Sequence, residues 1–135
     1  FSTMQIWRAG MNKMHFDEAL IWTSITTQER QEAGYRSSSS VGLTNLLADV
    51  DEAAMAAVLM ESGDGSVKVS LRCRPPYNVS EVAVELGGGG HPLAAGCTLP
   101  GPLAEAEATL VRSCKEAIER QSQAERVTAA EPATD

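Results

Sequence analysis

Residues 67–74 read VKVSLRCR, and their strict alternation of apolar and polar side chains predicts a strand with one buried face. The residues predicted to face a core are Val67, Val69, Leu71 and Cys73, and those predicted to face away are Lys68, Ser70, Arg72 and Arg74. Pro75 and Pro76 end the strand, because proline cannot donate a hydrogen bond to a sheet ladder.

The residues before this strand predict a hairpin. Residues 54–61 form a run of small apolar residues, and a turn at Gly63, Asp64 and Gly65 follows it. Because the run is rich in alanine, the pattern alone leaves a helix open there. Farther upstream, residues 19–25 suit a strand. Thr26 and Glu29 form a capping box that opens a short helix.

Apolar residues spaced three and four apart predict further helices. These cover residues 2–14, 43–50, 78–86 and 103–118. In the first helix, one stripe is interpreted as facing the core: Met4, Trp7, Met11 and Met14. The elements together predict the α/β class, with a small mixed or antiparallel sheet of about four to five strands flanked by helices.

Residues 87–96 read GGGGHPLAAG and carry the clearest functional signal. Consecutive glycines offer no side chain to pack, and their peptide N–H groups can form a nest that binds an anion. We expect His91 to cap a helical turn over residues 92–95, because proline is favoured at the first position of a helix. The free N–H groups of that turn would extend a phosphate site. The spacing matches neither a P-loop nor a dinucleotide-binding turn, and a structural linker is the alternative.

The distribution of charge points to the same region. The chain carries 11 Lys and Arg against 18 Asp and Glu, a net charge of −7, which argues against bulk attraction to polyanions. Residues 62–99 have no net charge, so a local anion site is most compatible with this stretch. Arg72 and Arg74 lie within it, and the arginine fork suits phosphate oxygens. A solvated strand face is the alternative interpretation.

Several classes of protein and site are excluded. No apolar run approaches the ~18 residues of a membrane span, and the first residues lack the pattern of a signal peptide. Three cysteines without a C-x-x-C spacing favour reduced thiols in a cytoplasmic protein. His15 and His91 are far apart in sequence, so we expect no zinc site of the usual spacing.

Three segments together resemble a known family. They are WTSITTQERQEAG (residues 22–34), KVSLRCR (68–74) and NVSEVAVELGGGGHPLAAGCTL (78–99), followed by an amphipathic helix. They resemble the C-terminal, DHH-associated substrate-binding domain of the DHH phosphoesterases. The nearer branch is the NrnA-like one, which hydrolyses short RNA oligomers and pAp, and RecJ is a more distant relative. The resemblance spans about residues 19–118.

The resemblance also implies site residues. In the family, the glycine loop and its histidine contact the substrate phosphate or the terminal nucleotide, and an arginine of the preceding strand assists. This implies a substrate-binding set of Gly88, Gly89, Gly90, His91, Arg72 and Arg74. Family catalysis belongs to a separate N-terminal domain, in which Asp and His residues hold two manganese ions. The Asp-His-His motif of that domain is absent from this sequence, so we expect no catalytic or metal site here and no hydrolysis by this chain alone.

The same resemblance divides the chain into three parts. Residues 1–18 would form a linker helix from the N-terminal catalytic domain, residues 19–120 the substrate-binding domain, and residues 121–135 a disordered polar tail. The expected partners are short RNA or nucleotide phosphates and the catalytic domain, with no membrane. A homodimer stays open for the full-length protein. Two alternatives also stay open: a free-standing regulatory nucleotide-binding module, and a structural or oligomer-forming fragment.

Overall fold

A six-stranded mixed sheet forms the centre of the structure, a computed structural model that describes residues 1–35, 40 and 42–130. The strands are β1 (His15–Asp17), β2 (Leu20–Ile25), β3 (Met55–Glu61), β4 (Val67–Cys73), β5 (Gly89–His91) and β6 (Ala94–Leu99). Their order is β1-β2-β3-β4-β6-β5, and only the pair of β2 and β3 is parallel. The predicted α/β class is confirmed, although the sheet has more strands than the four to five expected.

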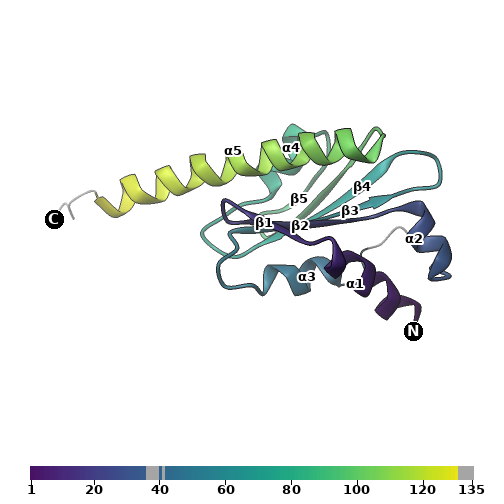
Figure 1. Cartoon of the computed structure of the whole chain (residues 1–135). Coiled ribbons are helices and arrows are strands. Elements are labelled where there is room, and N and C mark those ends of the chain that lie inside the picture. Colours follow the sequence, from purple (N-terminus) through teal and green to yellow (C-terminus); the bar gives the residue numbers. More distant parts are fainter. Residues whose placement is uncertain (36–39, 41, 131–135) are drawn as a thin grey trace.

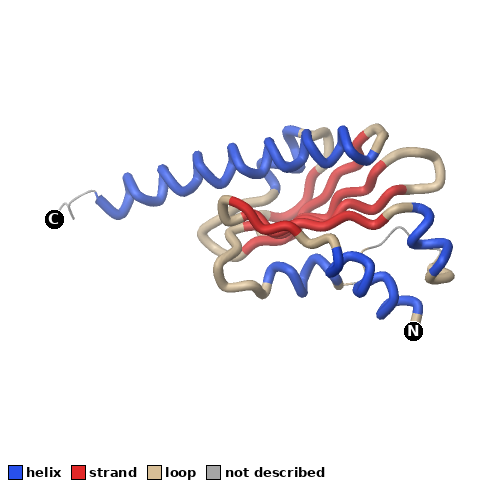
Figure 2. The backbone as a smooth tube through the Cα atoms, viewed as in Figure 1, coloured by secondary structure: helices blue, strands red, loops and turns tan. Residues whose placement is uncertain are grey.

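Helices pack on both faces of the sheet. α4 (Ser80–Glu85) and α5 (Leu103–Ala130) lie on one face, and α1 (Ser2–Asn12) and α3 (Leu43–Ala48) lie on the other (Figure 1). Figure 2 shows the strands as one red layer between these blue helices. α2 (Thr27–Glu32) begins at the predicted capping box, in which the Glu29 N–H donates to Thr26 Oγ1 at 3.0 Å and the Thr26 N–H donates to Glu29 Oε1 at 2.9 Å.

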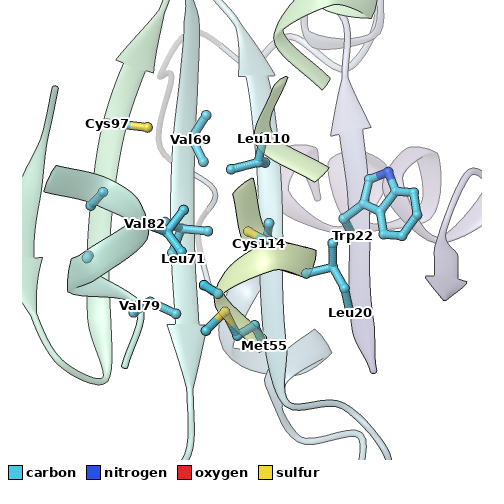
Figure 3. Close-up of a cluster of buried hydrophobic side chains, with 14 of the residues drawn as sticks. Leu20, Trp22, Met55, Val69, Leu71, Val79, Val82, Cys97, Leu110 and Cys114 are labelled. Carbon is cyan, nitrogen blue, oxygen red and sulfur yellow. The ribbon is translucent and has the colours of Figure 1, made fainter. Parts of the chain in front are cut away.

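The larger core lies between the sheet and the helices α4 and α5. The apolar residues of the alternating strand β4 are all buried in it, as predicted: Val67, Val69, Leu71 and Cys73. Figure 3 shows Val82 of α4 and Leu110 and Cys114 of α5 in the same cluster. Residues 55–61 form a strand that pairs with β4, so the predicted hairpin is confirmed and the helical alternative is wrong.

The smaller core lies under α1 and α3. Of the stripe predicted to face it, Trp7 packs against this core, but the prediction is wrong for the methionines. Met4 and Met11 are 69 % and 44 % exposed, whereas Ile6 and Gly10 are buried. Gly10 brings the helix close to its neighbours, because a Cβ at that position would lie 2.8 Å from Leu43 Cδ2. This close approach, and not the methionine stripe, determines which side of α1 faces the sheet.

The segment after the glycines also differs from the prediction. Residues 92–95 do not form a helical turn, because Pro92 and Leu93 connect β5 to β6 in a hairpin in which His91 pairs with Ala94. The fixed φ of proline suits the second position of a turn as well as the first position of a helix, so the residue type fits both structures. The predicted helix N-terminus beside the glycines is therefore wrong, and strand β6 begins at Ala94.

The last helix is longer than expected. α5 continues to Ala130, whereas the sequence predicts a disordered tail from residue 121. Gln121 fastens the helix to the loop before α4, since its amide accepts from the Asn78 N–H at 2.8 Å and donates to the Asn78 carbonyl at 2.9 Å. Residues beyond it include good helix formers. The tail prediction is wrong for residues 121–130, and residues 131–135 lie outside the described part of the chain.

Candidate functional site

One half of the sheet presents a face without a helical cover. In the part of the chain that the structure describes, α1 and α3 cover this face over β2 and β3, and α3 also reaches β4 beside Arg72. The rest of β4, together with β6 and β5, is left open. We call this surface the open face. None of its residues is buried: Lys68, Ser70 and Arg72 of β4, Ala94, Gly96 and Thr98 of β6, and Gly89 and His91 of β5.

The strand register aligns two of the predicted site residues across the open face. Arg72 pairs with Ala94, and Ala94 pairs in turn with His91. Directly opposite residues of antiparallel strands point to the same face, so Arg72 and His91 flank the small side chain of Ala94. Two strand spacings of ~4.8 Å place their Cα atoms about 10 Å apart. The arrangement can therefore present two hydrogen-bonding groups to one ligand.

Arg72 lies at the border between the open face and α3. Its Nε donates to Asn45 Oδ1 at 2.8 Å, and one terminal nitrogen donates to the Leu71 carbonyl at 2.8 Å. Asn45 thus holds the guanidinium over the surface. Sequence reasoning missed Asn45, because its helix is separated from β4 by a whole strand and no local pattern connects the two residues.

Arg74 has a different environment from Arg72. It follows the end of β4, and its terminal nitrogen donates to the carbonyls of Val50 and Asp51 at 3.1 Å each. It also forms an ion pair with the Asp51 carboxylate at 3.7 Å. Arg74 therefore fastens the segment after α3 to the end of the strand.

The three predicted glycines differ in what the fold requires of them. A Cβ on Gly88 would lie 2.1 Å from the Gly96 carbonyl oxygen. A Cβ on Gly90 would lie 2.6 Å from Ala95 Cα, and Gly90 also has a φ of +145°. These two glycines allow the edge strand to lie against β6. Gly89 has no atom within 4 Å of a Cβ and faces the open face, so packing does not require a glycine there.

The charge of the open face is positive in an acidic chain. Two of its residues carry a permanent charge, Lys68 and Arg72, and none carries a carboxylate. The alternation of residues 67–74 places both cations on this side. Phosphate oxygens are the natural ligands of such a surface, because charge-assisted hydrogen bonds to anions are stronger than neutral ones.

The described residues outside the open face show neither a metal-binding cluster nor a reactive thiol. Residues 1–35, 40 and 42–130 contain no group of three or more His, Cys, Asp or Glu side chains that could hold a metal ion. Burial raises the pKa of Cys97 to about 11 and that of Cys114 to about 12, so neither thiol suits a nucleophile. Across these same residues, we find no helix with the length and apolar character of a membrane span.

Comparison with known proteins identifies the fold and its family. The family model of the DHHA1 domain matches residues 20–120. The chain belongs to the DHHA1 family. This confirms the resemblance to the DHH-associated domain of DHH phosphoesterases.

The relatives of this DHHA1 domain are longer proteins. The bifunctional oligoribonuclease and PAP phosphatase NrnA of Thermus thermophilus is 35 % identical over 79 residues, which cover 57 % of this chain and 23 % of that protein. This relative belongs to the NrnA-like branch that the sequence resembles.

Two solved structures share the fold. An exopolyphosphatase-related protein from Bacteroides fragilis has a TM-score of 0.82 and 21 % identity, covering 90 % of this chain and 36 % of that one. The pGpG-specific phosphodiesterase PggH from Vibrio cholerae has a TM-score of 0.51 and 19 % identity, covering 82 % and 37 %. At these identities the two structures show the fold alone.

Proposed function

We propose that this DHHA1 domain binds the phosphate groups of short RNA oligomers or pAp on behalf of a DHH phosphoesterase. The observation that carries the proposal is the cross-strand row in which Arg72 and His91 flank Ala94 on the open face. Lys68 adds a second cation to the same strand face, in a chain whose net charge is −7. NrnA is an oligoribonuclease and PAP phosphatase, and PggH is a pGpG-specific phosphodiesterase, which supports this class of ligand.

The proposal assigns substrate positioning to this chain and hydrolysis to a separate N-terminal DHH domain. The described residues hold no group of three or more His, Cys, Asp or Glu side chains that could bind a metal ion, and the proposal places the manganese of the family in the separate catalytic domain. In the parent enzyme the metal ions would supply the activated water. Arg72 and Lys68 neutralise phosphate charge, and His91 contributes a hydrogen bond at the far strand. Together they hold the scissile bond in one orientation, which lowers the entropic part of the barrier.

A binding experiment tests the phosphate site directly. The 135-residue chain is titrated with pAp and with a 5′-phosphorylated RNA dinucleotide by calorimetry, at two salt concentrations. We expect saturable binding that weakens with salt. His91→Ala should raise Kd by at least about tenfold, since a hydrogen bond to a charged group contributes roughly 1.5–3 kcal/mol.

The matched control for this experiment is Arg126→Ala. Arg126 is exposed on α5, away from the open face, and should leave Kd unchanged. Equal affinity of the His91→Ala variant and the unmodified chain would contradict the binding role of His91. No binding of either nucleotide would favour a structural fragment instead.

A second experiment tests the division of labour. The purified chain is incubated with manganese and either pAp or the RNA dinucleotide, and release of phosphate or mononucleotide is measured. We expect no turnover, because two-metal hydrolysis needs several converging ligands. Turnover by this chain would overturn the assignment of hydrolysis to another domain.

A further inference from the structure

The β1 edge of the sheet has no neighbouring strand in the part of the chain that the structure describes. β1 (His15–Asp17) pairs with β2 on one side only, and all three of its residues are exposed. Such an edge presents N–H and C=O groups that can pair with another chain. In the strand order, this edge is opposite to β5, so a partner bound there leaves the open face accessible.

The β1–β2 hairpin holds this edge in a fixed conformation. Its two turn residues, Glu18 and Ala19, have φ values of 49° and 66°, the left-handed values that a two-residue hairpin turn requires. The Ala54 N–H donates to the Ala19 carbonyl at 2.7 Å, and Lys115 Nζ lies 2.6 Å from Asp17 Oδ2. The edge is therefore ordered before a partner binds, which reduces the entropic cost of association.

The turn determines which backbone groups of β1 point outward. The pair that flanks a two-residue turn, here Asp17 and Leu20, exchanges hydrogen bonds across the hairpin. Because this orientation alternates along an antiparallel strand, the N–H and C=O groups of Phe16 point away from β2. The centre of the edge thus offers one donor and one acceptor, which two identical strands related by a two-fold axis can exchange.

Exposed apolar side chains concentrate in the segment that ends at this edge. Seven large apolar side chains are exposed among the described residues, and five of them lie in residues 1–16. Phe16 is 51 % exposed, and Met14, immediately before the strand, is 45 % exposed. Phe16 pairs with Ile21 of the smaller core, so it lies on the face of the sheet that α1 covers. Methionine and aromatic side chains are enriched at protein interfaces, so this segment has the composition of one.

The charges of β1 complement a second copy of the same strand. Antiparallel pairing with Phe16 opposite the partner's Phe16 places His15 opposite the partner's Asp17, and Asp17 opposite the partner's His15. An imidazole N–H can donate to a carboxylate oxygen in either protonation state. Lys115 donates to Asp17 Oδ2, so Oδ1 is available to that histidine. Only this register gives both pairs, and pairs of this kind stabilise adjoining strands.

We propose that a second copy of this chain binds to the β1 edge, so that the two sheets join into one across a two-fold axis. The backbone groups of Phe16 exchange two hydrogen bonds with those of the partner's Phe16. The two phenyl rings meet on the face that α1 covers, and the histidine–aspartate pairs lie on the face that α5 covers. Because β1 is only three residues long, the dimer is weak, with a Kd on the order of 10 µM or above.

Sedimentation velocity of the 135-residue chain tests the dimer. Between about 1 and 300 µM we expect a shift from monomer to dimer. Phe16→Asp should raise the dimer Kd at least about tenfold, because it places two carboxylates together at the two-fold axis. Val84→Asp is the matched control, since Val84 is an exposed apolar residue of α4, beside the opposite edge of the sheet, and should leave the dimer Kd unchanged.

Cross-linking tests the register and does not depend on the fold of the Phe16→Asp variant. In the proposed pairing the two Cα atoms of Phe16 lie about 5.5 Å apart. A short bismaleimide should therefore link the Phe16→Cys chain into a covalent dimer, while the three native cysteines are buried. Met4→Cys is the control, because Met4 is 69 % exposed on α1 and lies outside β1, and it should give little dimer.

The outcomes decide the proposal. A monomer at every concentration, equal association of Phe16→Asp and the unmodified chain, or cross-linking of Met4→Cys as efficient as that of Phe16→Cys would overturn the pairing through β1. The phosphate site is tested separately, because Phe16→Asp should leave the Kd for pAp unchanged.

Discussion

Arg72 and His91 lie on strands that are not neighbours, yet they face the same surface, because Ala94 of β6 pairs with both of them. The relationship depends on the register of the sheet. A shift of β6 by one residue would turn Ala94 toward the larger core and turn Ala95 and Cys97 out of that core onto the open face. The side chains that bury β6 against the larger core therefore also maintain the geometry of the open face.

The two arginines should respond differently to substitution. Arg72→Ala should weaken dinucleotide binding by at least about tenfold, because it removes a charge-assisted hydrogen bond worth roughly 1.5–3 kcal/mol. Arg74→Ala should weaken binding less and lower the melting temperature more, because its bonds go to the carbonyls of Val50 and Asp51. Calorimetric titration and thermal melts of both variants check this. The reverse ranking of affinities would place Arg74 nearer the ligand.

The glycines offer a matched pair of substitutions. Gly90→Ala should destabilise the domain by about 1–3 kcal/mol, because its φ of +145° is strained for alanine and the methyl group meets Ala95. Gly89→Ala should change stability by less than about 0.5 kcal/mol and still weaken nucleotide binding, because its methyl group would project from the open face. Denaturant unfolding and titration measure the two effects. A Gly89→Ala variant as unstable as Gly90→Ala would contradict the distinction.

The ion pair of Lys13 and Glu29 should make stability depend on pH. Partial burial raises the pKa of Glu29, but the hydrogen bonds from Lys13 and the Thr26 backbone outweigh it and bring the pKa below its ordinary value of 4.5. The stabilisation is therefore present above pH 4.5 and is lost as the pH falls through the lowered pKa. Glu29→Gln should be less stable at pH 7, by up to about 1 kcal/mol, because glutamine keeps the capping box without the charge.

The measurement for Glu29 is urea unfolding of both chains between pH 7 and pH 3. The stability difference between the unmodified chain and Glu29→Gln should shrink below pH 4.5. Glu52→Gln, which changes an exposed carboxylate, is the control and should show a smaller difference at every pH. A Glu29 difference that stays constant over this range would show that charge is not its source.

The three thiols should be unreactive in the folded chain. All are buried, and burial raises the pKa of Cys97 to about 11 and that of Cys114 to about 12, so the thiolate is rare at pH 8. Burial raises the pKa of Cys73 as well. A thiol reagent should label the native chain slowly and the chain in denaturant quickly. Rapid labelling of the native chain would show that the larger core opens readily.

The strand that carries the cations is predictable from sequence because its signal is local. Alternation in residues 67–74 gives the buried face and the open face at once, and the capping box of Thr26 and Glu29 is equally local. The buried face of α1 is not predictable in this way. No local pattern in this helix shows that Gly10 is the residue that packs closely, because the contact depends on Leu43 of another helix.

Short edge strands leave even less in the sequence. β1 has three exposed residues and therefore no apolar periodicity. Its pairing with β2 is supported by the stacking of His15 on Trp22, whose ring centroids lie 5.1 Å apart. β5 is equally short and consists of glycines and His91. Because Pro92 suits a turn and a helix start alike, only the pairing of His91 with Ala94 distinguishes them.

The strands of the open face, β4, β5 and β6, all come from one continuous segment, residues 67–99. They join the sheet through antiparallel pairings between strands close in the chain, whereas the parallel pairing of β2 with β3 spans the helices α2 and α3. Closing a short loop costs less chain entropy than closing a long one. We therefore expect the half of the sheet that carries the open face to assemble early in folding, ahead of the crossover that completes the domain.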